Sequence, residues 1–194
     1  MSRGSTNSYT MAINLQKGQR QTLSAPKFTV GLGWDTQVGG AAGADFDLDA
    51  SVFLLRDTGK LVSDSFFVFY NNLASPDGAV THTGDNRTGE GDGDDEQIVV
   101  DLSTVDPRVH EISIVVTIHD AEKLKQNFGQ VRNAFIRIVD AGGAELMRYD
   151  LDEDFSVETA VQFGRIYRRG DEWKFGATGT GMKGGLEDYL AQYN

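Results

Sequence analysis

Hydrophobic and polar residues alternate along most of the chain with a period of two, which is typical of strands that bury one face. In the stretch 27–35, Phe28, Val30, Leu32 and Trp34 alternate with polar or glycine residues, and Asp35 ends the pattern. Similar patterns predict further strands at residues 46–54, 66–70, 97–102, 111–119, 134–139, 145–150, 160–169 and 173–177.

Four segments depart from this alternation. Residues 66–70 (FFVFY) form a continuous apolar run, which indicates a central strand of a sandwich. Short helices are predicted at 120–126, with Asp120 as the N-cap, and at 186–193. The glycine-rich segment 176–185 lacks the Gly-Lys-Ser/Thr ending of a phosphate-binding loop, so we interpret it as a flexible connection to the last helix.

Many strands with little helix predict an all-β fold. The expected architecture is a β-sandwich of mostly antiparallel strands with one or two short helices, including a C-terminal helix. A chain of 194 residues suits one domain with a substantial core, and we expect that domain to cover residues 11–194. Residues 1–10 are polar and aperiodic, which indicates a disordered leader or residues added by cloning.

Composition excludes several classes of function. The net charge of −11 argues against nucleic acid as a partner, because phosphate binding needs a basic surface. The chain has no cysteine, which excludes disulfides, thiolate metal sites and thiol redox chemistry. No apolar run approaches the roughly 20 residues of a membrane span. We therefore expect a cytoplasmic protein without membrane insertion, with a peripheral position at the inner face of the membrane as the alternative.

Acidic residues gather in two places. Residues 85–96 carry six acids, one arginine and three glycines, and Asp45, Asp47 and Asp49 share one face of the strand predicted at 46–54. Like charges held so close together raise the cost of ionising each other. Glycines let the backbone turn sharply, and hard divalent cations take six to eight oxygen ligands. The sequence therefore predicts a metal site, with calcium as the first candidate.

An EF-hand was tested as the source of this pattern. If Asp85 is the first ligand, Glu96 falls at the twelfth position, as the motif requires. The third and fifth positions are then Arg87 and Gly89, which offer no carboxylate or amide oxygen. Glu90 occupies the sixth position, where the turn needs glycine. The flanking segments are also predicted strands rather than helices, so the EF-hand is rejected.

Other interpretations of the acidic run stay open to different degrees. A solvated acidic loop is the simplest one, but this run leads directly into the strand predicted at 97–102. Zinc is disfavoured because no thiolate is present and His82, His110 and His119 have no close-spaced partners. Magnesium is an alternative that prefers fewer protein ligands and retains more waters.

Several motifs resemble the TerD family of tellurite-resistance and stress proteins. The similarity runs in order from about Met11 to the C-terminus, and the acidic run is its most specific part. The matching segments are MAINLQKGQ (11–19), GLGWD (31–35), FDLDAS (46–51), GDNRTGEGDGDDE (84–96), FGQVRN (128–133) and GDEWKF (170–175).

The resemblance implies a β-sandwich that binds two neighbouring calcium ions in an acidic cleft. It also implies a role in bacterial resistance to tellurite, other toxic agents and phage. Protein partners in a stress-resistance complex are expected, including a membrane-associated partner of the TerC type. Carried over to this sequence, the candidate ligands are Asp35, Asp47, Asp49, Asp85, Asn86, Thr88, Glu90, Asp94, Asp95 and Glu96, while Asp45 and Asp92 would shape the field without coordinating.

The leading hypothesis is a calcium-responsive binding module rather than an enzyme. Calcium would order the acidic loop and create a surface that a partner recognises. One alternative is a metal-dependent phosphoester hydrolase, which is disfavoured because no histidine or lysine lies close in sequence to the acidic runs. Another is calcium-dependent attachment to an anionic membrane surface. Direct chemistry on tellurite is not expected, because it would naturally use thiols.

Overall fold

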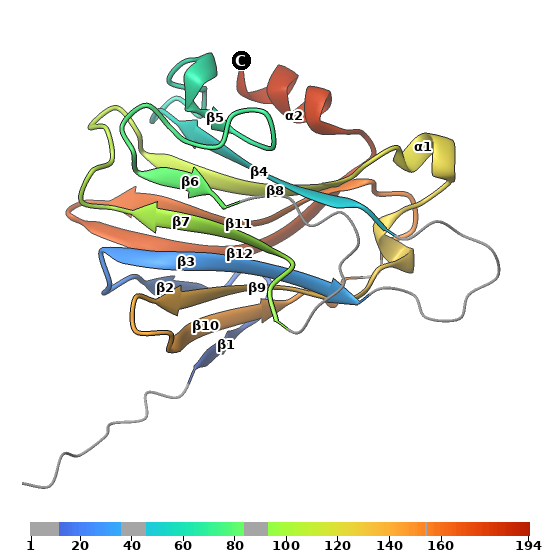
Figure 1. Ribbon diagram of the computed structural model, residues 1–194, viewed down its shortest axis with the longest axis horizontal. Helices are drawn as coiled ribbons and strands as arrows, with labels where there is room; N and C mark the ends of the chain where they lie inside the picture. Colours follow the sequence, from blue (N-terminus) through green and yellow to red (C-terminus); the bar gives the residue numbers. More distant parts are fainter. Residues whose placement is uncertain (1–11, 36–45, 84–92, 154) are drawn as a thin grey trace, which may run out of the picture.

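The computed structural model describes residues 12–35, 46–83, 93–153 and 155–194, which form two six-stranded β-sheets packed face to face (Figure 1). Among the described strands, β1 pairs with β10 in parallel and the other neighbours pair antiparallel. The predicted all-β sandwich of mostly antiparallel strands is therefore confirmed.

Strands from distant parts of the chain alternate in each sheet. The first sheet contains, in spatial order, β1 (Ile13–Leu15), β10 (Glu145–Asp150), β9 (Arg132–Asp140), β3 (Lys27–Asp35), β7 (Glu96–Asp101) and β6 (Val80–His82). The second contains β2 (Arg20–Thr22), β12 (Glu172–Met182), β11 (Ala160–Arg169), β8 (Glu111–Ile118), β4 (Leu48–Leu55) and β5 (Phe67–Val68). The alternating pattern predicts the longer strands but not β1, β2 and β6, which have three residues each.

The main core fills the space between the sheets. On β3 the apolar residues of the alternating pattern, Phe28, Val30, Leu32 and Trp34, are at most 6% exposed. They belong to one buried cluster with the inward residues of β4, β7, β8 and β9. Each fully buried side chain of this size contributes about 1.5–3 kcal/mol by leaving water, which explains why the period-two pattern determines the layers.

A smaller core lies on the outer face of the second sheet, under the C-terminal helix α2 (Leu186–Tyr193) (Figure 1). Tyr189 and Tyr193 of α2 are buried against this face, and the ring of Tyr193 lies 4.8 Å from that of Phe53 on β4. The predicted C-terminal helix is confirmed. The other helical segments are short: η1 (Asp64–Phe66), α1 (Ala121–Leu124) and η2 (Phe128–Gln130).

The prediction of Asp120 as a helix cap was wrong in its mechanism. Asp120 precedes α1, but its backbone is left-handed (φ 51°) and its side chain makes no capping hydrogen bond. Its carboxylate instead accepts a hydrogen bond from Lys123 Nζ at 2.9 Å, which lowers the pKa of Asp120.

The prediction of a central strand at 66–70 was also wrong. Only Phe67 and Val68 form a strand, β5, and it lies at the edge of the second sheet. The aromatic residues stack on one another instead: the ring of Phe67 lies 4.6 Å from Phe53 and 4.4 Å from Phe69. Phe67 and Phe69 therefore belong to the smaller core, whereas Phe66 and Val68 belong to the main core between the sheets.

The flexible connection expected at 176–185 is mostly strand, because β12 continues to Met182. The glycines here serve close packing. A Cβ on Gly179, whose φ is +53°, would overlap the hydroxyl of Tyr149, and one on Gly181 would overlap the ring of Phe155. Both positions need glycine so that other side chains can reach the backbone of the strand.

We expect Phe53→Ala to destabilise the protein by about 3–5 kcal/mol, because it leaves a cavity among the rings beneath α2. Urea unfolding followed by circular dichroism measures this change. Leu73→Ala is the control, because Leu73 is 46% exposed and its loss should change stability by no more than about 0.5 kcal/mol. Equal effects of the two substitutions would show that α2 is not held by this cluster.

Candidate metal centre

Four strand ends meet at one end of the sandwich. Leu32, near the end of β3, pairs with Glu96 at the start of β7, and His82 at the end of β6 pairs with Ile98. The start of β4 reaches the same place from the other sheet, because the Ala50 amide donates a 2.6 Å hydrogen bond to Glu96 Oε2. The strand ends that flank the two acidic segments of the sequence therefore lie close together.

Glu96 is the buried member of this group, with 2% of its surface exposed. Besides the Ala50 amide, its Oε2 lies 3.5 Å from Nε2 of His82, which is also buried. Burial raises the pKa of Glu96 to about 7, although the bonds from His82 and Ala50 oppose the shift. The carboxylate therefore joins the two sheets through a hydrogen bond and is poorly hydrated, so a cation beside it would favour its charged form.

Asp95 lies next to it and is held by the backbone of β3. Its Oδ2 accepts a 2.8 Å hydrogen bond from the Trp34 amide, and its own amide donates to the Leu32 carbonyl at 2.7 Å. Burial raises the pKa of Asp95. The bond from Trp34 opposes this shift, and the carboxylates of Asp94 and Asp35 add to it. Asp95 and Asp35 are thus close enough to repel each other.

The remaining described candidates stand around this pair. Asp35 is exposed at the end of β3, and its Oδ2 accepts a hydrogen bond from the Asn133 side chain. Asp47 and Asp49 are half-buried at the start of β4. Both contact His119, whose Nδ1 lies 3.5 Å from Asp49 Oδ2 and whose amide donates to the Asp47 carbonyl at 2.8 Å.

Asp94 differs from the other candidates because an arginine neutralises it. Its carboxylate is 2% exposed and accepts a 2.7 Å hydrogen bond from Arg137 Nε on β9. It lies directly over Gly31 on the outer face of the first sheet, where a Cβ would overlap it. This arrangement favours a structural role for Asp94, and its role as a ligand stays a prediction.

The rest of the predicted ligand set is not tested. Asp85, Asn86, Thr88 and Glu90 lie outside the described residues, as do Asp45 and Asp92. Within the described part of the chain, no group of three or more His, Asp or Glu side chains is arranged to hold a metal ion. The donor chemistry nevertheless suits a hard cation, because the converging groups are oxygen ligands and the chain has no thiol.

The sequence did not predict that His82 and Arg137 are partners of acidic residues in this region. His82 was considered only as a zinc ligand, whereas it is packed against Glu96 inside the sandwich. Arg137 was not considered, although the strand pattern at 134–139 places it on the outer face, and the register sets it opposite Gly31. A glycine facing an arginine across a strand pair leaves room for a third side chain, which is the position that Asp94 takes.

Comparisons with known proteins place this chain in a family. The model of the TerD domain matches residues 11–193. Tellurium resistance protein TerD of Serratia marcescens is 56% identical over 189 residues, covering 94% of this chain and 97% of its own. General stress protein 16U of Bacillus subtilis (strain 168) is 52% identical with the same coverage. The crystal structure of a homologue of telluride resistance protein (TerD) from Streptomyces coelicolor A3(2) has a TM-score of 0.67 at 21% identity, over 86% of this chain and 96% of that chain, and shares the fold.

We expect Gly31→Ala to destabilise the protein by about 1–3 kcal/mol, because the new methyl group would displace Asp94 from Arg137. The measurement is thermal and urea unfolding. Gly176→Ala is the matched control, since it also lies within a strand but its Cβ would meet its nearest neighbour at an ordinary 3.5 Å. A Gly31→Ala protein as stable as the control would contradict the packing described for Asp94.

We expect the ionisation of Glu96 to destabilise the calcium-free protein as the pH rises from about 4.5 to 7. Its pKa is 4.5 when unfolded and about 7 when folded, so the folded state binds the proton more tightly. The stabilisation by protonated Glu96 is fully present below the unfolded-state pKa and is lost as the pH rises through the folded-state pKa. Glu96→Gln keeps an acceptor for the Ala50 amide and removes the titration.

The check is the free energy of unfolding in the presence of EDTA at pH 5 and pH 8, compared between wild type and Glu96→Gln. The variant should gain stability relative to wild type at the higher pH. Glu187→Gln, at an exposed position of α2, should follow wild type at both values. A difference between Glu96→Gln and wild type that does not change with pH would refute the shift.

Proposed function

The chain belongs to the TerD family, and from this premise we propose that it is a calcium-binding module of a bacterial tellurium-resistance or stress-response system. The proposal depends on one observation above all. Strand ends that flank both acidic segments meet at one end of the sandwich, with Asp95 and Glu96 already in place there. Since carboxylates gathered in this way repel each other, a divalent cation is the simplest group that stabilises them together.

The proposed ligands come from both clusters. Asp35, Asp47, Asp49, Asp95 and Glu96 would contribute from the described strand ends. Asp85, Asn86, Thr88 and Glu90 would complete the set for two ions. When bound, calcium would supply positive charge and fix the ends of β3, β4 and β7 relative to each other. Asp94 would stay with Arg137 and help to hold the start of β7.

A groove beside the acidic end supports a role in partner binding. It measures about 1220 Å³ and runs along α1 and the start of α2, with Asp49 and His119 at its border. A change of charge at Asp49 would therefore alter a surface large enough to accept part of another protein. We propose that this surface binds protein partners of a stress-resistance complex. These partners include a membrane-associated protein of the TerC type.

We assign a binding role and no catalytic one. The relatives carry names of resistance and stress proteins. His82, the histidine nearest to Glu96, is packed inside the sandwich and cannot contact a substrate there. No observation on the described residues favours phosphoester hydrolysis or attachment to lipid. In the described part of the chain no helix is long and apolar enough to cross a membrane.

Calorimetric titration of EDTA-stripped protein with calcium, at about 1 mM magnesium, tests the proposal directly. We expect two binding events that survive magnesium. Saturation at about 100 times the dissociation constant should stabilise the fold by about 2.7 kcal/mol per site. Absence of both heat and thermal stabilisation would overturn the calcium module.

Asp95→Asn should weaken calcium binding at least tenfold, because it removes a charge while leaving an acceptor for the Trp34 amide. The matched control is Asp171→Asn in the exposed turn between β11 and β12, which should bind calcium as wild type does. Equal binding by the two variants would place the ions away from Asp95.

A further inference from the structure

His119 lies between the acidic end of the sandwich and the groove beside α1. It directly follows β8, at the point where β8 pairs with the start of β4. Its amide donates to the Asp47 carbonyl at 2.8 Å, which continues this pairing one step beyond Leu48. Figure 1 shows α1 at the same end of the sandwich, where β3 ends and β4 begins. The position of His119 is therefore fixed by its backbone.

The imidazole of His119 reaches the carboxylate of Asp49. Its Nδ1 lies 3.5 Å from Asp49 Oδ2, and the exposed fractions of the two side chains are 50% and 13%. Nδ1 carries a proton both in the imidazolium and in one neutral tautomer, so either form can donate to a carboxylate. Asp49 is mostly shielded from water, whereas His119 is the member of the pair that faces solvent.

Asp49 is also coupled to the buried part of the acidic cluster. It directly precedes Ala50, whose amide donates to Glu96 Oε2 at 2.6 Å. Burial is the main cause that raises the pKa of Glu96, and the charge of Asp49 adds to it. Asp49 thus interacts with Glu96 on one side and with His119 on the other.

On its solvent side, His119 lines the groove of about 1220 Å³ that runs along α1 and the start of α2. Among the described residues, Tyr70 and Val157 are large apolar side chains with 45% and 55% of their surface exposed, and both line this groove. Exposed apolar side chains that gather in one place are typical of surfaces that bind other proteins. A change in the position of His119 would therefore change the lining of such a surface.

We propose that His119 is a positioning residue that couples the proposed calcium site to the groove. The proposal rests on the proposed function, because it takes Asp49 as a ligand of calcium. A bound cation repels an N–H group that points at the same carboxylate oxygen. When Asp49 coordinates calcium, His119 therefore loses its partner and turns into the groove.

Direct coordination of calcium by His119 is disfavoured by its chemistry. Hard cations take oxygen ligands, whereas imidazole suits softer metals. Within the part of the chain that the structure describes, no group of three or more His, Asp or Glu side chains is arranged to hold a metal ion around it. His119 therefore acts through Asp49.

Coupling of this kind works in both directions. A ligand shifts an equilibrium only if it binds the two arrangements with different affinities. Calcium would favour the arrangement in which His119 faces the groove. A partner that contacts His119 there would strengthen calcium binding by the same factor by which calcium strengthens the binding of that partner.

Calcium titration of the ¹⁵N-labelled full chain, followed by amide shifts, tests the coupling. We expect calcium to shift groove amides away from the acidic residues, such as those of Val157 and Leu186. His119→Ala should remove most of each shift, because the contact that transmits the change is lost. It should also tighten calcium binding about two- to fivefold, because Asp49 loses a competing partner. A residue that only held the start of β4 in place would have the opposite effect on affinity.

Two further variants isolate the role of Nδ1. His119→Asn places a side-chain N–H donor close to the position of Nδ1, so it should restore the wild-type shifts and affinity. His110→Ala is the matched control, because His110 is exposed just before β8, at the other end of the same strand. All three variants should fold, since both histidines are exposed and the bond from the amide of residue 119 to Asp47 is kept.

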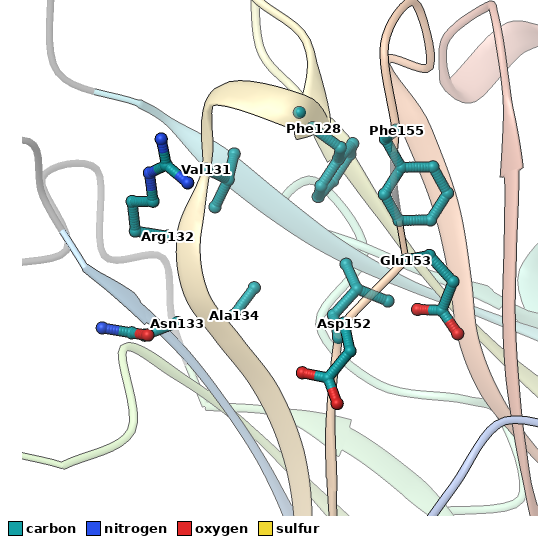
Figure 2. A pocket seen from close by; sticks show the side chains of 10 residues that line it. Phe128, Val131, Arg132, Asn133, Ala134, Asp152, Glu153 and Phe155 are labelled. Atoms are coloured by element: carbon teal, nitrogen blue, oxygen red, sulfur yellow. The ribbon is translucent and has the colours of Figure 1, made fainter.

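Asn133 reports calcium binding independently of His119. Its side chain donates a hydrogen bond to Asp35 at the end of β3, and Figure 2 shows it beside a smaller cavity. This cavity shares no lining residue with the groove. The side-chain amide signal of Asn133 should therefore shift with calcium in wild type and in every variant.

The outcomes separate the coupling from the calcium module. Groove amides that stay unchanged while the Asn133 signal shifts would overturn the coupling and leave the calcium module intact. The coupling is also wrong if the groove shifts persist in His119→Ala, if that variant binds calcium more weakly, or if His119→Asn behaves like His119→Ala. If neither Asn133 nor the groove responds and calorimetry detects no binding, the proposed function and the coupling are both refuted.

Discussion

The hydrogen bond from the Ala50 amide to the Glu96 carboxylate joins the two sheets at the end where the acidic residues gather. A buried carboxylate is costly unless its oxygens are satisfied, and here one oxygen meets both a backbone donor of the opposite sheet and His82. The strand ends that carry Asp35, Asp49 and Asp95 are positioned by this junction. Charge repulsion, which the sequence concentrates in two segments, is therefore focused on one small region of the fold.

The structure separates the acids of this region into different roles. Asp94 turns to the outer face and pairs with Arg137, which also contacts Glu145 at 3.1 Å. Asp95 and Glu96 follow directly, yet they turn to the backbone of Trp34 and Ala50 instead. Three consecutive acids thus reach three different environments, because Asp94 and Asp95 precede β7, which begins at Glu96, and do not follow its alternation. Arg137 neutralises Asp94, whereas burial raises the pKa of both Asp95 and Glu96.

Alternation was sufficient to predict the long strands and the sandwich, because burial of one face dominates those elements. It failed where local packing dominates. The glycines of residues 176–182 resemble a flexible segment in sequence, but they make room for Tyr149 and Phe155. The run at 66–70 resembles a central strand, but it forms only a two-residue edge strand, and its Phe67 and Phe69 rings stack in the smaller core. In both cases the deciding neighbours are distant in sequence.

The sequence predicted only in part which acidic residues of the candidate site lie together. Acid spacing indicated a hard-cation site, and Asp35, Asp95 and Glu96 do meet at one end of the sandwich. The pairing of Asp94 with Arg137 could not be foreseen from spacing, because it depends on the register that places Gly31 opposite Arg137. Neighbours along the chain share a cluster in sequence, whereas the sheet decides which of them share a face.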